Sequence, residues 1–211
     1  MEVEGHYYQK ILDDAGVDLN QPLDVEKYAT IDVDPQDFVD FTVKYRSEAT
    51  VKSFHPRPFL DHEFNHIATC ANWIGYNAHN TTESNWGLDP THNTMLKEII
   101  GISNFDRLGL DPNACLLRLL EYNPGHTLPL HFDGKEGFRS LYGDETRADR
   151  FFVAISAWDW GHFLQVHDKM IYNWNPGDTW IIPPNVWHLS GNAGIQPKLT
   201  LTITGVINGK E

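Results

Sequence analysis

Two residues in the second half of the chain have the types and the spacing of metal ligands. His131 and Asp133 lie two positions apart in the segment Leu130-His131-Phe132-Asp133. On a strand, residues i and i+2 project from the same face, so this imidazole and this carboxylate can bind one ion. With a second histidine they would form the two-histidine, one-carboxylate site of non-haem Fe(II) oxygenases, which leaves coordination positions open for other ligands.

The His-x-Asp pattern alone is weak, because the chain contains 11 histidines in 211 residues. The residues that follow the pattern support its interpretation as part of a metal site. His188 follows the turn Asn175-Pro176-Gly177-Asp178, a predicted strand and a second tight corner, and is the expected second histidine. Lys198 stands ten residues after His188, at the start of a strand-like segment. A buried lysine on a core strand requires an anionic partner, and a dicarboxylate ligand would supply one.

The segment Lys198–Thr204 alternates with the period of a β-strand. One face would carry Lys198, Thr200, Thr202 and Thr204, and the other face Leu199, Leu201 and Ile203. The apolar face must pack between sheets or under helices, which leaves the lysine and threonine face to line a barrel interior. Lys198 would pair there with the distal carboxylate of a dicarboxylate, and Thr200 would donate a hydrogen bond to it.

The elements that must position these residues are short strands separated by turn residues. The predicted strands are Ala114–Tyr122, Phe151–Trp158, Phe163–Val166, Met170–Trp174, Asp178–Ile182 and Leu199–Val206, with a hairpin around His167-Asp168-Lys169. Such strands at this spacing are typical of a sandwich or barrel. We therefore expect one domain, 1–211, whose β core covers 111–207.

Residues 1–110 have a weaker pattern and are expected to form a buttress rich in helices and loops that shapes the substrate site. We expect a helix at Tyr7–Ala15, a strand within Phe38–Val51 and a long loop at Trp73–Asn93. The clearest helix begins at Asp89-Pro90, because aspartate is a good N-cap and proline suits the first helical position. It is predicted to continue through Ile100 and to end at Gly101.

The order of these parts resembles the 2-oxoglutarate-dependent Fe(II) oxygenases, whose core is a double-stranded β-helix. The resemblance covers Leu116–Ile207, with the motifs Glu121-Tyr122-Asn123-Pro124-Gly125, Leu128-Pro129-Leu130-His131-Phe132-Asp133, Arg150–Trp158, Asn175-Pro176-Gly177-Asp178, Trp187-His188 and Gly191-Asn192-Ala193-Gly194. It looks closest to prolyl-hydroxylase-like and aspartyl/asparaginyl-hydroxylase-like members, including small stand-alone members carried by phages. Many members have arginine at the position of Lys198, whereas prolyl 4-hydroxylases have lysine.

The resemblance implies a protein that is mainly β with flanking helices around a jelly-roll, cupin-like core. It implies that His131, Asp133 and His188 bind Fe(II) and form the catalytic centre, with O2 and 2-oxoglutarate as co-substrates. The implied reaction is hydroxylation of an unactivated C–H bond in a peptidyl or amino-acid-like substrate, with release of succinate and CO2.

The resemblance also implies which residues bind 2-oxoglutarate. Lys198 occupies the position of the basic residue that binds the C5 carboxylate. Tyr122 would place its hydroxyl on the same carboxylate, or else be an ordinary strand aromatic. Arg150 would bind a carboxylate of 2-oxoglutarate or of the substrate, or else form a surface ion pair.

Two other classes of protein fit the same residues. A cupin-like protein would use this β core to bind a metal or a ligand without oxygen chemistry, although cupins usually have more histidines and a glutamate ligand. A zinc hydrolase would hold a water molecule on the triad. The chain has one His-Glu-x-x-His sequence, His62-Glu63-Phe64-Asn65-His66, which is separate from the predicted triad, and no obvious general-base glutamate beside the triad.

Composition narrows the expected partners. The formal net charge is −13, from 16 basic and 29 acidic residues, which disfavours nucleic acid and anionic membranes as partners. No apolar stretch has the length of a membrane span, and the N-terminal pattern is not that of a secretory signal. Cys70 and Cys115 are expected to be packed thiols in a reducing, cytoplasmic location. The expected partner is a small-molecule, peptide or protein substrate, and the oligomeric state stays open.

Overall fold

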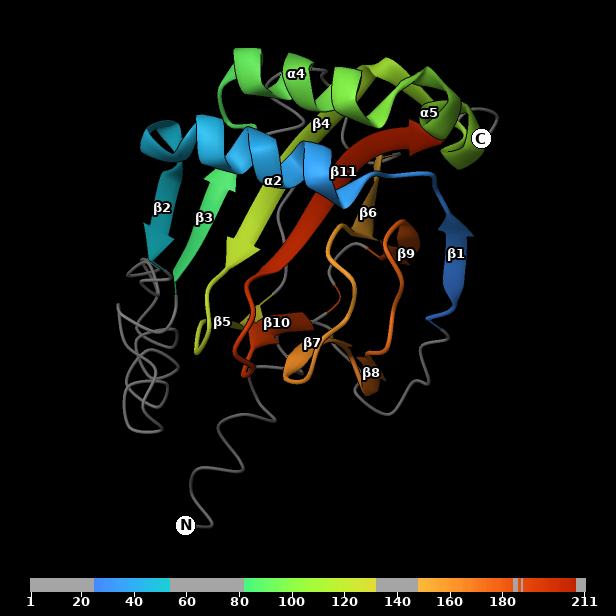
Figure 1. Ribbon diagram of the computed structural model, residues 1–211. Helices are drawn as coiled ribbons and strands as arrows, with labels where there is room; N and C mark the ends of the chain where they lie inside the picture. The colour runs from blue at the N-terminus through green and yellow to red at the C-terminus, as the bar shows by residue number, and fades with distance from the viewer. Residues whose placement is uncertain (1–24, 54–81, 132–147, 184–185, 187, 208–211) are drawn as a thin grey trace, which may run out of the picture.

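The computed structural model describes residues 25–53, 82–131, 148–183, 186 and 188–207. These residues form two antiparallel β-sheets with helices on one side (Figure 1). The elements are β1 (Lys27–Thr30), α2 (Pro35–Lys44), η1 (Arg46–Glu48), β2 (Thr50–Ser53), β3 (Thr82–Trp86), α4 (Pro90–Ile100), α5 (Ile102–Leu108), β4 (Leu110–Tyr122), β5 (Thr127–His131), β6 (Ala148–Ala154), β7 (His162–Val166), β8 (Lys169–Ile171), β9 (Asp178–Ile182), β10 (His188–Asn192) and β11 (Lys198–Ile207).

The strand order identifies the fold. The larger sheet has the order β1-β9-β6-β11-β4-β3-β2, and the smaller sheet has the order β5-β10-β7-β8. From β4 to β11 the chain passes back and forth between the sheets, so that β11 lies between β4 and β6 while β10 lies between β5 and β7. Eight strands wound in this way form a jelly roll. The predicted fold class, a double-stranded β-helix with flanking helices, is confirmed.

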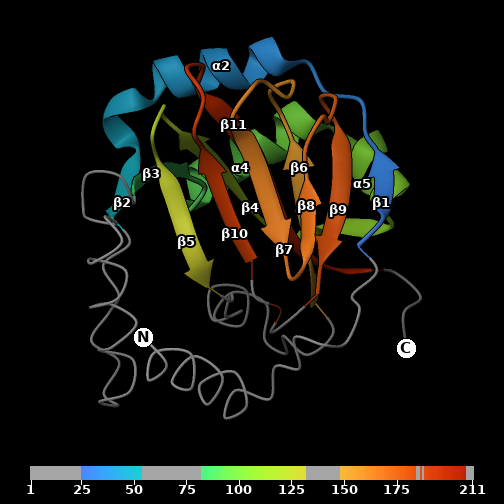
Figure 2. The same cartoon turned by 90° about the horizontal axis from the view of Figure 1, so that it is seen from below.

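The N-terminal part of the described chain extends the larger sheet at both edges. Strand β1 pairs with β9, while β3 pairs with β4 and in turn with β2. Figure 2 shows the smaller sheet in front of the larger one, with β1 at one side and β2 and β3 at the other. The first half of the chain therefore contributes to the sheet as well as to the helical layer.

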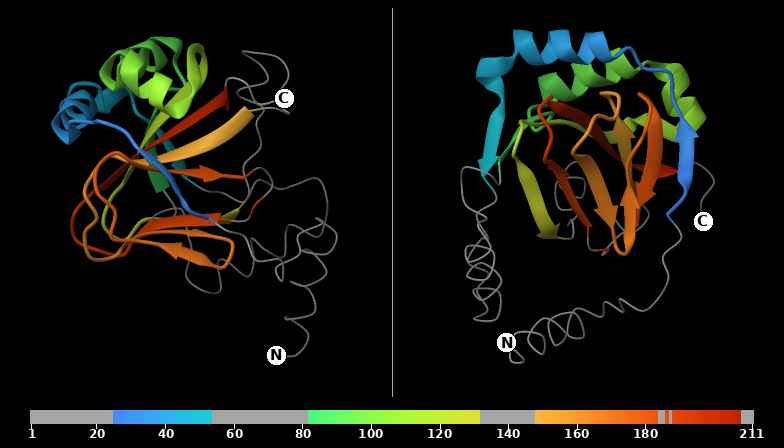
Figure 3. Two further views of the ribbon diagram at one scale, coloured as in Figure 1. Left: turned by 90° about the vertical axis from the view of Figure 1, so that its right-hand side faces the viewer. Right: turned by 60° about the horizontal axis from the view of Figure 1, so that its bottom comes forward.

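Helices α2, α4 and α5 cover one face of the larger sheet, and the smaller sheet lies on the other side (Figure 3). The core under the helices is apolar and includes Phe38, Phe41, Leu96, Ile100, Phe105 and Leu108 from the helices and Leu117, Leu119, Phe151, Val153, Leu199, Leu201 and Ile203 from the sheet. A second apolar cluster lies between the sheets and includes Phe152, Ala154, Leu164, Val166, Trp174 and Trp180. Successive residues of β6 thus alternate between the two clusters, as the pleat of a strand requires.

The predicted division of Lys198–Thr204 into two faces is confirmed. Leu199, Leu201 and Ile203 pack under the helices. Lys198, Thr200 and Thr204 are buried, and Lys198 reaches the strands of the smaller sheet. The polar face of β11 therefore lines the interior of the jelly roll.

The helix predicted from Asp89-Pro90 to Gly101 is confirmed as α4. The side chain of Asp89 accepts a hydrogen bond from the backbone N–H of Thr91, and Gly101 is the C-cap. The strands in the second half agree within a few residues, except that β6 ends at Ala154 and not at Trp158, and β8 ends at Ile171 and not at Trp174.

Two predictions for the first half are wrong. The segment Phe38–Val51 is mainly helix α2, because Asp34 caps its N-terminus and Phe38 and Phe41 pack on the sheet. The segment Trp73–Asn93 is not one long loop, since it contains β3 and the start of α4. The helix expected at Tyr7–Ala15 lies outside the described residues. None of the described helices is long and apolar enough to cross a membrane.

Replacing Leu201 by alanine tests the packing of the helical layer on the sheet. Leu201 is completely buried in the cluster under the helices, so Leu201→Ala should lower the free energy of unfolding by about 2–5 kcal/mol. Val43→Ala is the control, because Val43 on α2 is 67% exposed and its truncation should change stability by less than about 0.5 kcal/mol. Equal effects of the two changes in urea unfolding would contradict this packing.

Candidate functional site

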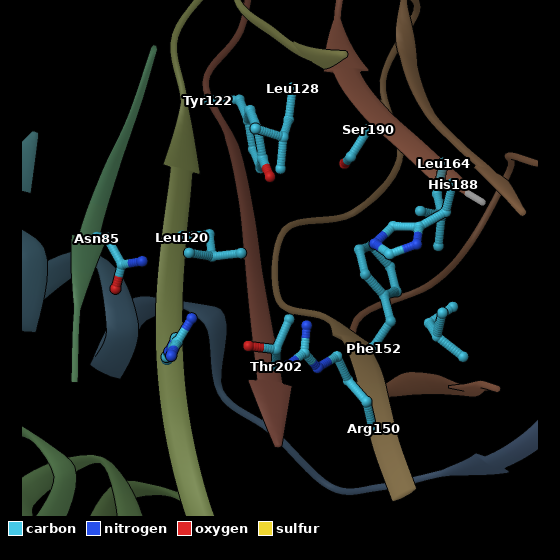
Figure 4. Close-up of a pocket in the computed structure, with 12 residues that line it drawn as sticks. Asn85, Leu120, Tyr122, Leu128, Arg150, Phe152, Leu164, His188, Ser190 and Thr202 are labelled. Atoms are coloured by element: carbon cyan, nitrogen blue, oxygen red, sulfur yellow. The ribbon is translucent and has the colours of Figure 1, made fainter. Parts of the chain in front are cut away.

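A pocket between the two sheets collects the polar side chains of the interior. It is lined by residues from both sheets, among them Tyr122, Arg150, His188, Ser190 and Thr202 (Figure 4). Arg118 of β4 also lines it. The pocket therefore contains one of the predicted metal ligands and two of the predicted 2-oxoglutarate contacts, Tyr122 and Arg150.

His188 is the first residue of β10, and its side chain is buried in the pocket wall. Its Nδ1 lies 3.0 Å from the backbone carbonyl of Val186. A carbonyl only accepts, so Nδ1 carries the proton and Nε2 is the nitrogen with the lone pair. Metal-binding histidines are commonly oriented by such a bond.

Burial lowers the pKa of His188 to about 4, and the positive charge of Arg150 acts in the same direction, while the bond to Val186 opposes them. The imidazole is therefore neutral near pH 7. Neutral imidazole is the form that binds a metal ion, because a protonated ring has no lone pair to donate.

The second predicted histidine ligand is the direct cross-strand partner of the first. In the pairing of β5 with β10, His131 lies opposite His188. The register shifts between His188 and Ser190, which marks a β-bulge at this point. Paired positions on antiparallel strands lie on the same face of a sheet, and bulges are common beside active sites. The fold thus brings the backbones of the two predicted histidine ligands together.

The third predicted ligand, Asp133, lies outside the described residues, and so does the side chain of His131. Among the side chains that are described, no group of three or more histidine, cysteine, aspartate or glutamate residues is arranged to hold a metal ion. The triad of His131, Asp133 and His188 therefore stays a prediction.

Lys198 is completely buried between the sheets, and its ammonium group reaches Ser190, two positions along β10 from His188. Its Nζ donates to the carbonyl of Phe163 at 2.6 Å, to Oγ of Ser190 at 2.6 Å and, at a longer 3.4 Å, to the carbonyl of Gly191. The rings of Tyr122, Trp174 and Phe152 surround it at 5.0, 5.4 and 5.7 Å from the ring centres. Burial lowers the pKa of Lys198 to about 7.

Two predicted neighbours of Lys198 lie close to it. Tyr122 is its cross-strand partner on β4. Thr200 is completely buried two positions along β11, and its Oγ1 has no hydrogen-bond partner among the described residues. A buried hydroxyl without a partner is costly in free energy, so Thr200 is suited to bind a ligand beside the ammonium group.

Arg150 lines the pocket between the sheets, and its side chain points into this space (Figure 4). Burial lowers the pKa of Arg150 to about 10, and the charge of Arg118 acts in the same direction. The described residues that line the pocket include no aspartate or glutamate.

Ser190 lines the pocket and was not among the predicted site residues. Ser190 lies two positions after His188 on the same strand, so strand alternation places it on the face of His188. That signal was present in the sequence. Arg118 carries no local signal, because its place in the pocket depends on β4 lying beside β11.

The depressed pKa of Lys198 predicts a dependence of stability on pH. Between pH about 7 and the ordinary lysine value of 10.5, the unfolded chain binds more protons at this position than the folded chain. The stability of the wild type should therefore rise across this window by a few kcal/mol relative to Lys198→Met, which cannot titrate. Urea unfolding of both proteins at several pH values measures the difference. A difference that stays constant with pH would contradict the lowered pKa of Lys198.

No protein-family model matches the sequence, and no curated protein is similar to it. The chain is similar to the solved structure of a cupin 2 conserved barrel domain protein from Rhodopseudomonas palustris, with 19% identity, 45% of this chain and 55% of that chain covered, and a TM-score of 0.33. It is also similar to a cupin protein from Bacteroides fragilis, with 16% identity, 51% of this chain and 76% of that chain covered, and a TM-score of 0.34. A predicted oxalate decarboxylase from Thermotoga maritima has 10% identity, with 59% of this chain and 81% of that chain covered, and a TM-score of 0.35.

These identities and TM-scores are low, so the jelly-roll assignment rests on the strand order described above. None of the three proteins is named as a 2-oxoglutarate oxygenase.

Proposed function

We propose that this protein is an Fe(II)- and 2-oxoglutarate-dependent dioxygenase that hydroxylates an unactivated C–H bond of a peptidyl or amino-acid-like substrate. The observation that carries the proposal is the register of β5 and β10, which pairs His131 with His188 beside an interior pocket. Two histidines paired in this way, with Asp133 two positions after one of them, are the donor set that non-haem Fe(II) prefers.

The residues present fit an iron site at this place. His188 offers Nε2 as the acceptor nitrogen, because its Nδ1 proton is held by the carbonyl of Val186. His131 would supply the second imidazole and Asp133 the carboxylate. The low pKa of His188 keeps its ring neutral, so that a metal ion does not have to displace a proton there.

The residues also fit 2-oxoglutarate. Lys198 is a buried cation whose described partners are all neutral oxygens, and Thr200 carries a buried hydroxyl without a described partner. A carboxylate placed here would neutralise Lys198 and accept a hydrogen bond from Thr200. The aromatic rings around Lys198 would keep water away from the ion pair, which strengthens it.

With iron and 2-oxoglutarate bound, O2 would be the oxidant: one of its oxygen atoms would enter the substrate C–H bond, the other would enter succinate, and CO2 would leave. The chain's residues bind and orient the reactants. His188 would hold the iron at one end of the pocket, while Lys198 and Thr200 would hold the distal carboxylate toward the other end. This arrangement would fix the position of 2-oxoglutarate relative to the metal.

One observation favours the alternative, a cupin-like metal- or ligand-binding protein without oxygenase activity. The ammonium group of Lys198 already donates to three protein oxygens, as a lysine with a purely structural role would. The cupin-like fold is common to both functions. Turnover of 2-oxoglutarate separates them.

The test measures succinate formed from 2-oxoglutarate with Fe(II) under air. The wild type should release succinate, and His131→Ala, His188→Ala and Asp133→Ala should reduce the rate at least about a hundredfold, because each removes one of three iron ligands. His126→Ala is a matched control, since His126 precedes β5 and is not among the residues lining the pocket. Full turnover in any of the three variants would overturn the ligand assignment, and no succinate from the iron-loaded wild type would favour the cupin-like alternative.

A further inference from the structure

Three aromatic side chains form a cluster on the surface of the jelly roll. The aromatic cluster consists of Trp158 and Trp160, in the connection between β6 and β7, and Tyr172, directly after β8. The ring centre of Trp158 lies 5.5 Å from that of Trp160 and 6.3 Å from that of Tyr172. Trp160 is 80% exposed and Tyr172 is 63% exposed. None of the three is among the described residues that line the pocket, so the cluster is a separate surface feature.

Hydrogen bonds hold the backbone that carries these rings. The backbone N–H of Trp158 donates to the carbonyl of Trp174 at 3.1 Å, and its indole N–H donates to the carbonyl of His162 at 2.7 Å. The backbone N–H of Ala193 donates to the carbonyl of Gly161 at 2.8 Å. The connections that precede β7, β9 and β11 are therefore tied together. A surface fixed in this way loses little conformational freedom when a ligand binds to it.

Two glycines allow these connections to touch. Gly161 has a φ of +90°, and a Cβ atom there would collide with the backbone of Gly194. A Cβ atom at Gly194 would in turn collide with the backbone carbonyl of Trp160. The backbone of Trp160 is thus closely packed, while its side chain stays in the solvent. Since burying a large aromatic side chain is favourable, a tryptophan that a packed backbone keeps exposed is suited to contact a partner.

The charge beside the aromatic cluster is negative. Asp159 lies between the two tryptophans, and its Oδ1 accepts a hydrogen bond from the backbone N–H of Trp160 at 2.7 Å. Within the described connections 155–161, 172–177 and 193–197, Asp159 is the one carboxylate, and there is no lysine or arginine. Burial lowers the pKa of His162, so this neighbouring ring is neutral near pH 7. The negative charge favours a positively charged ligand.

The tilt of the rings also favours a cation. The ring planes of Trp158 and Trp160 are inclined by 54°, and those of Trp158 and Tyr172 by 55°. Rings tilted in this way do not form a flat platform, on which a sugar ring or a nucleic-acid base would stack. A compact cation needs no such platform, because the face of each ring is electrostatically negative and attracts it.

We propose that the aromatic cluster and Asp159 bind an arginine side chain in a basic segment of a partner protein. The guanidinium group would lie against the exposed rings of Trp160 and Tyr172, and the carboxylate of Asp159 would balance its charge. Arginine suits this place because its planar group stacks on aromatic faces. The inference is independent of the proposed function, since it requires neither iron nor 2-oxoglutarate.

Calorimetric titration of the full chain with short peptides tests the inference. The probe is acetyl-Gly-Arg-Gly-Arg-Gly-amide, and the matched control peptide has citrulline in place of both arginines, which keeps the shape of the side chain and removes its charge. The arginine peptide should bind at least about tenfold more tightly than the citrulline peptide. Its affinity should fall as sodium chloride is added, because salt screens exposed charges.

Substitutions in the cluster separate attraction to the rings from simple apolar contact. Trp160→Leu keeps an apolar side chain and removes the ring, so the affinity for the arginine peptide should fall about threefold to fivefold, and Tyr172→Leu should act similarly. Trp160→Phe should stay within about twofold of the wild type. Asp159→Asn should weaken binding as Trp160→Leu does, although its amide oxygen can still accept from the N–H of Trp160.

The control variant is Ile102→Ala, because Ile102 is 63% exposed on α5 in the helical layer, and its affinity should equal that of the wild type. Thermal melting verifies that each variant is folded. Equal binding of the two peptides, no binding of the arginine peptide, or unchanged affinity in Trp160→Leu would overturn the inference. Tighter binding of maltohexaose or of a proline-rich peptide would assign the cluster to another class of ligand. A wild-type dimer in sedimentation that Trp160→Leu dissociates would show that a second copy of the chain covers it instead.

Discussion

The burial of one lysine ammonium group between the two sheets is the interaction on which the interior of this protein depends. Lys198 belongs to the larger sheet, yet its Nζ donates to Phe163 on β7 and to Ser190 on β10, both in the smaller sheet. Transfer of a charge from water into a protein interior is unfavourable unless hydrogen bonds and counter-charges compensate for it. The oxygen atoms and aromatic rings around Lys198 offset part of the cost of burying its charge. The offset is incomplete, because burial still lowers the pKa of Lys198.

The interior around this interaction combines two kinds of chemistry. Beside Lys198, the amide of Asn192 donates to the carbonyls of Tyr122 and Gln196, which ties the turn after β10 to β4 and to the start of β11. Tyr122 and Ser190, which contact Lys198, also line the pocket that His188 and Arg150 line. A cation suited to a buried carboxylate and the predicted metal ligand therefore lie beside one pocket.

Local patterns predicted much of the second half of the chain, because strand alternation and turn residues are local signals. The two faces of β11 followed from the alternation of Lys198, Leu199 and Thr200, and α4 followed from its caps at Asp89 and Gly101. Strand β3 could not be predicted in this way, since its sequence has no alternating apolar residues and it forms by pairing with β4. In α2, the exposed residues Val39 and Val43 imitate a strand pattern, although packing of Phe38 on the sheet selects the helix.

Three of the predicted site residues, Tyr122, Arg150 and His188, line one pocket, but the strand arrangement that brings them together has no local sequence signal. The cross-strand pairing of His131 with His188 agrees with a shared site. This pairing depends on β5 lying beside β10, which no local sequence pattern encodes. The same holds for Arg118, which reaches the pocket because β11 places β4 near β6. The carbonyls of Phe163 and Gly191 that bind Lys198 are backbone groups, and backbone groups have no sequence signature.

The central claim is that iron and 2-oxoglutarate meet beside His188, and an anaerobic optical titration tests it most directly. Fe(II) is added to the protein without O2, followed by 2-oxoglutarate, while the visible absorption is recorded. The account predicts a weak metal-to-ligand charge-transfer band that appears only when both are present, is lost in His188→Ala and needs more 2-oxoglutarate in Lys198→Met. A wild-type protein that binds Fe(II) and shows no such band at saturating 2-oxoglutarate, or an equally strong band in His188→Ala, would contradict it.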